Sequence, residues 1–308
     1  YNLDSFKTLQ DSKSKFTDGM GIVLARNLEY IDPKVLEQKF PALTFLQSGI
    51  SVDNSGGYAD NITKRKKSVV GDDTVTGGSD RGANKGEISL KYEKDTIRVY
   101  DGFKFSKWTE TDIKKAELEG INLVTDYIRG HNEVYNHIID KAGLVGVEGN
   151  LGLLNYGFAS TGATGAITGL TPQQMYDEFA TLITDQWNSV YNTAGYTANV
   201  IVTSDIVLNL LSKTMLNTAS GTATVMRALQ DNFAGVKFVG TSKAYNGTSS
   251  VAVAFSNMSE AMSFRVPVRL TIGEIIKQSS FSYQVDSMFR VAGLDVAEST
   301  AGRKLTGL

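Results

Sequence analysis

The two histidines, His131 and His137, carry the side chains that most readily support metal binding or acid–base catalysis near neutral pH. Both fall in a stretch with helical periodicity, where six residues correspond to a rotation of about 240° at about 100° per residue. A helical metal pair needs the i, i+4 spacing, which places both rings on one face. The spacing therefore predicts no metal site. We interpret both histidines as polar positions on a long helix.

Nucleophilic and carboxylate chemistry is also poorly supported. The chain contains no cysteine, which excludes thiol catalysis, disulfide bonds and thiolate zinc sites. No serine lies in a sequence that resembles a nucleophile elbow. Glu117, Glu119 and Asp126 are interpreted as a solvated helix face, because nothing isolates them as an acid–base pair. We therefore predict no catalytic, cofactor-binding or metal-binding residue.

Glycine recurs at every third position from Gly143 through Gly146 and Gly149 to Gly152. Such a tract can let backbone amides approach a phosphate. It lacks the Gly-Lys-Ser/Thr of a P-loop and does not open a clear helix after a strand, so neither nucleotide fingerprint is satisfied. A tight connection between two domains is the favoured interpretation.

A basic run from Lys64 to Lys67 is followed by two acids in a segment rich in Gly, Ser, Asp and Lys. No aromatic residue interrupts the run to stack on a base, which makes it a poor reader of nucleic acid. It is either a solvated loop or a set of ion pairs with an adjacent subunit. The candidates for subunit contacts are Lys64, Arg65, Lys66, Lys67, Asp72 and Asp73.

Composition narrows the functional classes further. Of 308 residues, 41% are apolar and 21% charged, which is ordinary for a folded soluble protein. Because 31 Lys and Arg face 33 Asp and Glu, no net field draws the chain onto nucleic acid or an anionic membrane. No stretch approaches the roughly 18 consecutive apolar residues of a membrane span. Since the first residue is Tyr1, we expect either a cleaved leader or numbering that covers part of the product.

The elements that would position these residues begin with a weakly periodic arm to about residue 46, with a short helix expected at 33–40. From about 47 to 88 apolar residues are too sparse for a core. Strict alternation of Ile88, Leu90 and Tyr92 with polar residues then predicts a half-buried strand. Apolar positions as far as Phe105 indicate a continuation or partner strand. The region is interpreted as a long extended β-hairpin loop.

The strongest helical pattern covers about 111–142 and would make one rod of roughly 45 to 50 Å. Gly120 and Gly130 inside it mark bends or close packing. A second helix begins at Thr171, where Pro172 suits the first helical position and Gln174 can complete a capping box.

The rest of the sequence alternates short helices and strands. Because Pro267 cannot donate to a ladder, its strand is expected at a sheet edge. The fold class is α+β. The expected strands are 200–203, 236–239, 251–255, 266–272 and 281–285, the last two antiparallel, and the expected helices are 206–216 and 225–232.

The order of these parts resembles that of the tailed-bacteriophage major capsid family, whose fold is shared with encapsulins and the herpesvirus capsid floor. That order is a polar arm, an extended loop, a very long helix, a Gly-rich link, a compact α/β region and return strands. The resemblance covers nearly the whole chain. The matching stretches are 28–33 (LEYIDP), 105–110 (FSKWTE), 116–120 (AELEG) and 152–155 (GLLN).

The resemblance implies a phage major-capsid fold with four parts. They are an N-terminal arm at 1–46, an extended loop at 47–88, a peripheral domain with the spine helix at 89–150 and 262–288, and an axial domain at 151–261 and 289–308. Tyr1 would fit a leader removed during shell maturation. Some family members form a Lys–Asn cross-link, but no such pair can be matched here and none is predicted.

The function implied is that of a non-enzymatic shell subunit. Copies of the chain would assemble as hexamers and pentamers into an icosahedral shell around the double-stranded DNA of a tailed phage, without specific DNA binding and without a membrane. Portal, scaffolding, maturation protease and decoration proteins are implied as further partners. The chain would belong to the virion capsid and be assembled in the host cytoplasm.

Three other functions stay open at this point, of which an extracellular adhesin or surface protein is weakened by the lack of a secretory signal. An encapsulin-type nanocompartment has the same fold but packages proteins, and the extended loop favours a phage shell. An α+β enzyme with an unrecognised site is disfavoured by the lack of a catalytic constellation.

Overall fold

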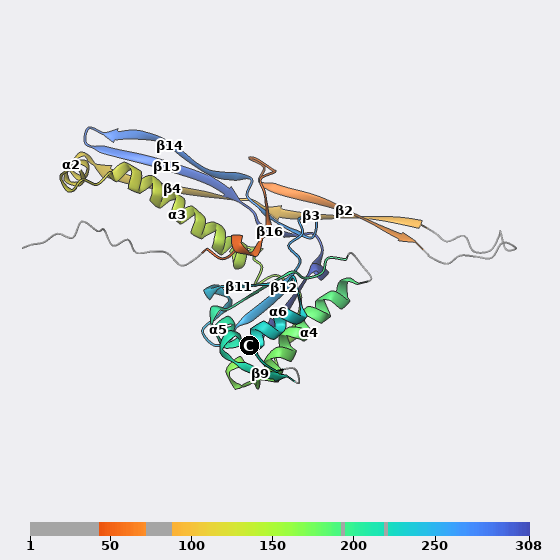
Figure 1. Ribbon diagram of the computed structural model, residues 1–308. Helices are drawn as coiled ribbons and strands as arrows, with labels where there is room; N and C mark the ends of the chain where they lie inside the picture. Colours follow the sequence, from red (N-terminus) through yellow and green to blue (C-terminus); the bar gives the residue numbers. More distant parts are fainter. Residues whose placement is uncertain (1–42, 72–87, 192–194, 219–220) are drawn as a thin grey trace, which may run out of the picture. The chain divides into compact units, whose positions relative to one another are not determined.

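The structure, a computed structural model, describes residues 43–71, 88–191, 195–218 and 221–308. Helices and sheets are both present, and the predicted α+β class is confirmed (Figure 1). The helix expected at 33–40 and the candidates Asp72 and Asp73 lie outside the described residues. Within those residues, no helix combines the length and apolar character needed to cross a membrane.

The expected single rod at 111–142 is wrong, because Gly120 interrupts it. Helix α2 (Glu110–Glu119) ends at Gly120, whose φ of 72° lies in the left-handed region that favours glycine. Asn122 then caps the longer α3 (Leu123–Leu144) by accepting a hydrogen bond from the Thr125 amide. Gly130, by contrast, stays inside α3. A stop residue and a new cap two positions later therefore outweighed a continuous apolar periodicity.

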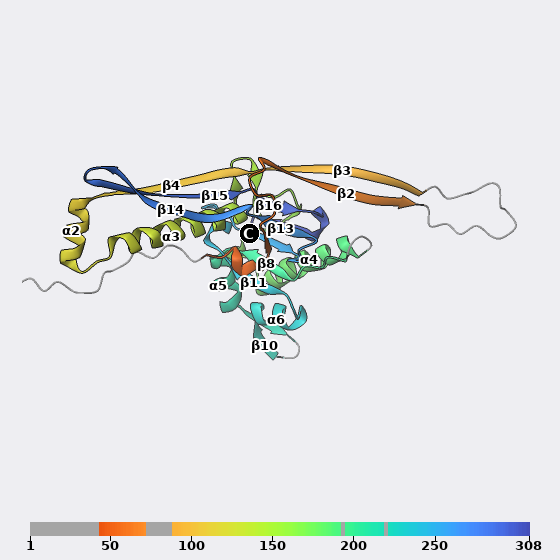
Figure 2. The same ribbon diagram turned by 90° about the horizontal axis from the view of Figure 1, so that it is seen from above.

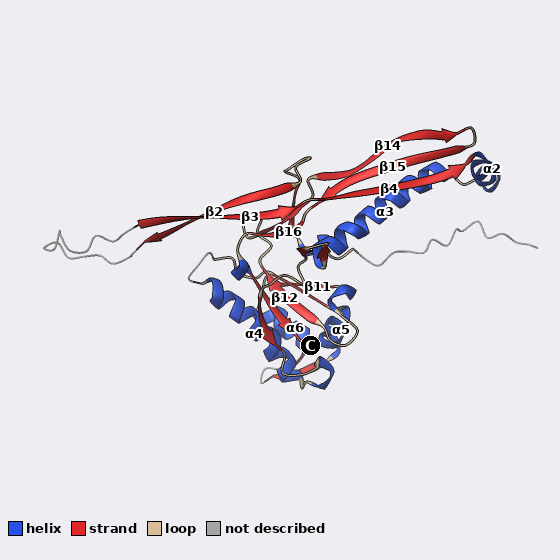
Figure 3. Ribbon diagram, turned by 180° about the vertical axis from the view of Figure 1, so that it is seen from behind, coloured by secondary structure: helices blue, strands red, loops and turns tan. Residues whose placement is uncertain are grey.

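Helix α3 packs against one face of a three-stranded antiparallel sheet (Figure 3). Aromatic pairs join the two layers, with ring centroids 5.1 Å apart for Trp108 and Tyr127 and 5.2 Å apart for Tyr135 and Phe289. Pro267 immediately precedes an edge strand, as predicted. In sheet order, the strands are β14 (Val268–Ser279), β15 (Ser282–Val291) and β4 (Tyr100–Thr109).

His131 is buried between α3 and this sheet and does not lie on a solvated face. One ring nitrogen lies 2.9 Å from the Ser106 hydroxyl of β4 and the other 2.7 Å from the Ser287 hydroxyl of β15. The imidazole therefore joins two neighbouring strands to the helix. Because both nitrogens have hydroxyl partners inside the fold, its role is structural.

The second region is a five-stranded mixed sheet with helices packed on it (Figure 1). The capping box at Thr171 and Gln174 is confirmed at the start of α4. The helix expected at 206–216 ends early, at Lys213, since a short hairpin follows it. The helices are α4 (Pro172–Val190), α5 (Asp205–Lys213) and α6 (Val225–Asn232), and the hairpin strands are β9 (Met215–Thr218) and β10 (Gly221–Thr224).

The strands expected at 200–203, 236–239 and 251–255 all belong to this sheet. The first of them lies between the other two and pairs parallel with one and antiparallel with the other. The strands, in sheet order, are β11 (Lys237–Gly240), β8 (Val200–Thr203), β12 (Val251–Phe255), β17 (Gly302–Thr306) and β7 (Ala159–Gly162).

A small three-stranded sheet brings together segments that are distant in sequence. Its central strand pairs parallel with a strand from the region expected to be a loop. The order is β1 (Ser51–Asp53), β13 (Met262–Arg265) and β16 (Gly293–Val296). The expected loop at 47–88 is therefore anchored at its start by a β-ladder.

The glycine tract forms the turn between α3 and the second region. Strands β5 (Gly146–Val147) and β6 (Asn150–Leu151) make a two-stranded ribbon, with Gly146 at a φ of 109°. The backbone at Gly152 lies so close to that of Leu144 and Val145 that a Cβ would overlap it. The glycines serve a tight connection here, and no phosphate-loop geometry of strand, loop and helix is present in this part of the chain.

Phe45 fixes the first described segment to the core. Its ring is fully buried, packs edge-on to Phe264 at 4.7 Å and leaves no room for a side chain at Gly143. The buried Asp140 carboxylate accepts hydrogen bonds from the amides of Thr44 and Phe45, at 2.7 and 2.6 Å, and from Lys243. The chain is thus held where the described segment begins.

A matched pair of glycine substitutions tests this packing. Gly143→Ala should lower the free energy of unfolding by about 1–3 kcal/mol, because the new methyl group overlaps the Phe45 ring. Gly130→Ala in the same helix should raise it by about 1 kcal/mol, because that position opens onto free space. Urea unfolding of the unassembled subunit measures both. Equal effects of the two substitutions would contradict the packing argument.

Candidate assembly site

The extended loop is built on a long antiparallel hairpin of β2 (Asn61–Gly71) and β3 (Ile88–Arg98) (Figure 2). The strand expected from the alternation at Ile88 is confirmed and continues to Arg98. The expectation that it is half-buried is wrong, because its apolar side chains Leu90 and Tyr92 are exposed on a two-stranded hairpin. The register pairs Asn61 with Arg98 and Gly71 with Ile88. Threonine hydroxyls of Thr63 and Thr96, 3.0 Å apart, fix which side chains share a face.

The hairpin splits the basic run between its two faces, because successive side chains of a strand point to opposite sides. Lys64 lies on one face and Arg65 and Lys67 on the other, exposed. Lys66 is paired in register with Glu93. A contiguous run in the sequence is therefore not a contiguous surface, and only Arg65 and Lys67 are seen exposed on a common face.

Lys64 forms an ion pair inside its own chain. Its Nζ lies 2.6 Å from Oδ2 of Asp295 on β16, a carboxylate that is only 1% exposed. Arg265 of β13 donates to the same oxygen from Nε at 2.9 Å and also pairs with Asp53 of β1. Two cations thus alternate with two carboxylates, so the cluster is close to neutral. Removal of one cation would leave the negative charge of a buried carboxylate only partly compensated, which is strongly unfavourable.

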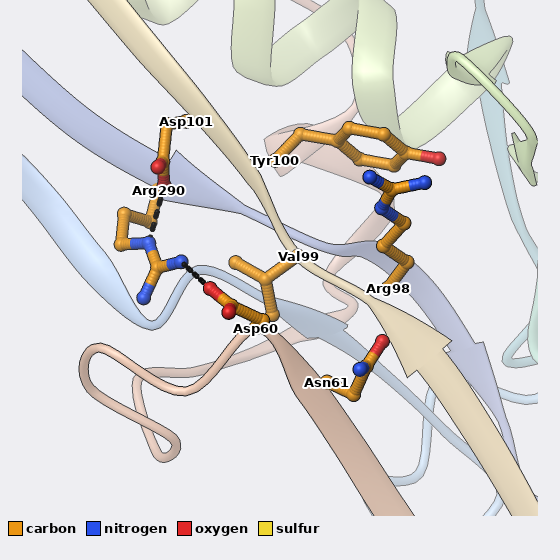
Figure 4. A pocket seen from close by; sticks show the side chains of 7 residues that line it. All are labelled: Asp60, Asn61, Arg98, Val99, Tyr100, Asp101 and Arg290. Carbon is orange, nitrogen blue, oxygen red and sulfur yellow. Dashed lines mark hydrogen bonds and ion pairs between the residues drawn. The ribbon is translucent and has the colours of Figure 1, made fainter.

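A second arginine fastens the segment that leads into β2. Arg290 of β15 pairs with Asp101 of β4 and, at 3.0 Å, with Asp60 immediately before β2 (Figure 4). Its guanidinium also lies 5.9 Å from the centre of the Tyr58 ring. The open polar pocket around this arginine is lined as well by Arg98, which lies against the ring of Tyr100 (Figure 4). Arg265 and Arg290 therefore attach the base of the hairpin to the folded body.

The pKa shifts agree with this arrangement. The hydrogen bond to Asp101 is the main cause that raises the pKa of Arg290, and Asp60 adds to it. The Ser55 amide donates to Asp53 and lowers the pKa of that carboxyl from 3.8. The ionised Asp53 carboxylate therefore contributes its full stabilisation of the fold at pH values above 3.8. This contribution is lost as the pH falls below 3.8 and passes the lowered pKa of the folded state. Strong acid should therefore loosen the base of the hairpin.

Sequence reasoning missed the residues that hold the hairpin. Asp53, Asp60, Arg265, Arg290 and Asp295 lie in three separate stretches, at 53–60, 265 and 290–295, and no local spacing connects these stretches. The one available signal was a pair of arginines in otherwise apolar strands. An arginine that is predicted to be buried needs a carboxylate partner.

The outer face of the β14–β15–β4 sheet, opposite α3, carries exposed aromatic side chains. Phe103 and Phe105 of β4 are about two-thirds exposed, at 66% and 64%. A shallow groove beside them is lined by Thr271, Gly273 and Met288. In contrast, the described residues contain no group of three or more acidic or histidine side chains that could hold a metal ion. The surface features suit contact between proteins better than chemistry.

Comparison with known proteins identifies the family. The sequence pattern of the family described as "Major capsid protein" matches residues 85–308, most of the chain. The chain belongs to the major capsid protein family. No curated protein matches it.

Solved capsid structures share its fold. The capsid of Myoviridae phage XM1 is 42% identical, with a TM-score of 0.82 over 92% of this chain and 98% of that one. The capsid of an empty GTA particle is 12% identical, with a TM-score of 0.62 over 92% and 96%. Mycobacterium phage Che8 gives 16% identity and a TM-score of 0.60 over 90% and 96%. The major-capsid fold inferred from the order of elements is confirmed, and the chain is a phage shell protein.

Substitution of Lys64 tests whether the ion pair holds the hairpin. Lys64→Gln should broaden the distance distribution between spin labels at Leu90→Cys on β3 and Ile206→Cys on α5, because Asp295 loses its link to the hairpin. Electron–electron resonance on the unassembled subunit measures the distribution, and the absence of native cysteines makes the labelling specific.

Two controls separate the ion pair from a general loss of charge. Lys64→Arg should keep the narrow distribution, and so should Lys67→Gln, which removes the same charge from the opposite face. Equal broadening in Lys64→Gln and Lys67→Gln would contradict the role of Asp295.

Proposed function

We propose that copies of this chain tile an icosahedral shell that encloses the double-stranded DNA of a tailed phage. The observation that carries the proposal is the 42% identity to the phage XM1 capsid over 98% of that chain. The likeness also covers 92% of the present chain. An encapsulin-type compartment would have the same fold, and the identity of the enclosed molecule separates the two functions.

The subunit contacts are proposed from the surfaces that one chain leaves open. A two-stranded hairpin is at best marginally stable in water, and side chains on both faces of this one are exposed. Such elements gain stability when they lie across a neighbour, which links folding to shell closure. We propose hexamers and pentamers of the chain as the units of the shell, since closed symmetry limits growth.

The four parts given by the resemblance are retained as a proposal. They are the arm at 1–46, the loop at 47–88, the peripheral domain at 89–150 and 262–288 and the axial domain at 151–261 and 289–308. The α3 layer and the five-stranded sheet support a division between a peripheral and an axial region. Arg65, Lys67, Asp72 and Asp73 remain proposed subunit contacts, as does Lys66, whereas the ion pair of Lys64 favours a role within the chain.

The remaining partners are also proposals. Portal, scaffolding, maturation protease and decoration proteins would act on a shell that assembles in the host cytoplasm. The chain itself would enclose the DNA without specific binding, in keeping with its near-neutral charge. We propose no enzymatic role, because the family to which the chain belongs is one of structural capsid proteins.

A shortened hairpin tests the assembly role. Replacement of residues 66–93 by Asn-Gly joins Arg65 to Lys94, its partner in the ladder, through a two-residue turn and keeps the Lys64–Asp295 pair. We expect a folded subunit with the unfolding midpoint of the full chain but no closed shells in electron micrographs. This truncation leaves β1 and the buried Ile50 in place, unlike removal of the whole loop.

The full-length chain, which should give closed particles under the same conditions, is the reference. Shells of normal size and yield from the shortened chain would rule out the hairpin as an assembly element. A full-length chain that stays monomeric under every assembly condition would overturn the proposed function itself.

A further inference from the structure

The two faces of the β2–β3 hairpin differ in charge. Side chains directly opposite each other in an antiparallel ladder share a face. On one face Lys64 is opposite Asp95, and Glu93 lies on the same face two residues before Asp95, so this face carries acids as well as a cation. On the other face Arg65 is opposite Lys94, Lys67 follows, and Arg98 lies at the base. Within the two described strands, this second face carries no Asp or Glu, and we call it the basic face.

The basic face is unfavourable for an isolated hairpin. Like charges directly opposite each other destabilise a ladder, and Arg65 and Lys94 are such a pair. No ion pair within the described residues compensates Arg65, Lys67 or Lys94. By contrast, Lys64 on the other face forms an ion pair with the buried Asp295. The arrangement is therefore one that a negatively charged partner would stabilise.

Apolar side chains on the same face indicate the kind of partner. Tyr92, opposite Lys67, is 66% exposed, and Leu90, two residues before it, is 48% exposed. A surface that combines cations with a tyrosine and a leucine fits a partner that combines carboxylates with an apolar side chain. A phosphate backbone offers the charge but not the apolar contact.

The chain carries a surface of that complementary type at the end of α2. Glu117 and Glu119 are exposed there, and Leu118 between them is 89% exposed. Neither glutamate pairs with a basic side chain in the described part of the chain. Several other surface acids already have partners, namely Glu110 with Lys114, Glu133 with Arg129, Asp185 with Arg303 and Asp231 with Arg227.

We propose that the basic face of the hairpin docks on the Glu117–Glu119 end of α2 in a second copy of the chain. This inference rests on the proposed shell function and specifies its contact. The two surfaces differ, so the contact is head-to-tail, and head-to-tail contacts close into rings when the rotation permits. Lys64 acts as a positioning residue that fixes the hairpin through Asp295 while the opposite face stays available.

Charge reversal on each surface, and on both together, tests the docking. R65E/K67E and E117K/E119K should each abolish shells, because each places like charges across the contact. The quadruple variant should restore shells, because it recreates opposite charges in the reverse sense. R65E puts a carboxylate opposite Lys94, so the hairpin itself is not weakened by that change. Electron microscopy and sedimentation velocity of the full chain provide the measurements.

Lys91→Glu is the matched control. Lys91 is exposed on the same hairpin but belongs to the other face, opposite Ser68, and its reversal should leave assembly unchanged. Circular dichroism confirms that each variant is folded before its assembly is compared. Normal shells from R65E/K67E, or both double variants defective with no recovery in the quadruple variant, would overturn the proposal.

A nucleic-acid role for the basic face gives a different result. Fluorescence anisotropy with a labelled double-stranded DNA would then show that the wild type binds DNA and that R65E/K67E does not. If R65E/K67E still forms shells, docking on a second copy is overturned. Failure of the proposed shell function is distinguishable as well. That function is contradicted if wild-type subunits form pairs in sedimentation but never form shells. The docking is still supported in that case if the double variants lose the pairs and the quadruple variant recovers them.

Discussion

The Asp295 carboxylate is buried at the point where three parts of the fold meet. It accepts from Arg265 of the neighbouring strand and from Lys64 of the hairpin, and Arg265 in turn holds Asp53. A buried carboxylate that loses its cations is left with most of its desolvation penalty. This constraint fixes β1, β13 and β16 to one another and determines where the hairpin leaves the body.

The same principle explains why the fold uses ion pairs at this place instead of more apolar packing. The base of a hairpin has little apolar surface to bury, since both faces of its two strands are largely exposed. Arg265 and Arg290 provide directional contacts to Asp53 and Asp60, which flank the loop before β2. An arginine fork specifies orientation as well as attraction. The hairpin is thus held in place without a core of its own.

Packing takes over where the chain is compact. The first described segment is joined to α3 and the core by Phe45, which packs against Gly143 and Phe264. Helix α3 is joined to its sheet by the aromatic pairs and by His131, which lies between Ser106 and Ser287. The outer face of the sheet, with Phe103 and Phe105, is left exposed. A capsid subunit built in this way leaves exposed aromatic surface for its neighbours.

Local signals in the sequence determined much of the secondary structure. The capping box at Thr171, the alternation from Ile88 and the edge position that follows Pro267 all act within a few residues, so a single sequence reveals them. The order of elements was enough to indicate the family. The end of α2 at Gly120 was set by local features as well, namely the left-handed glycine and the Asn122 cap two residues later. Tertiary structure alone decided that Lys64 turns inward to Asp295 and that Arg65 and Lys67 face out. Those outcomes depend on strands that are neighbours in space but distant in sequence, and no local periodicity records such a pairing.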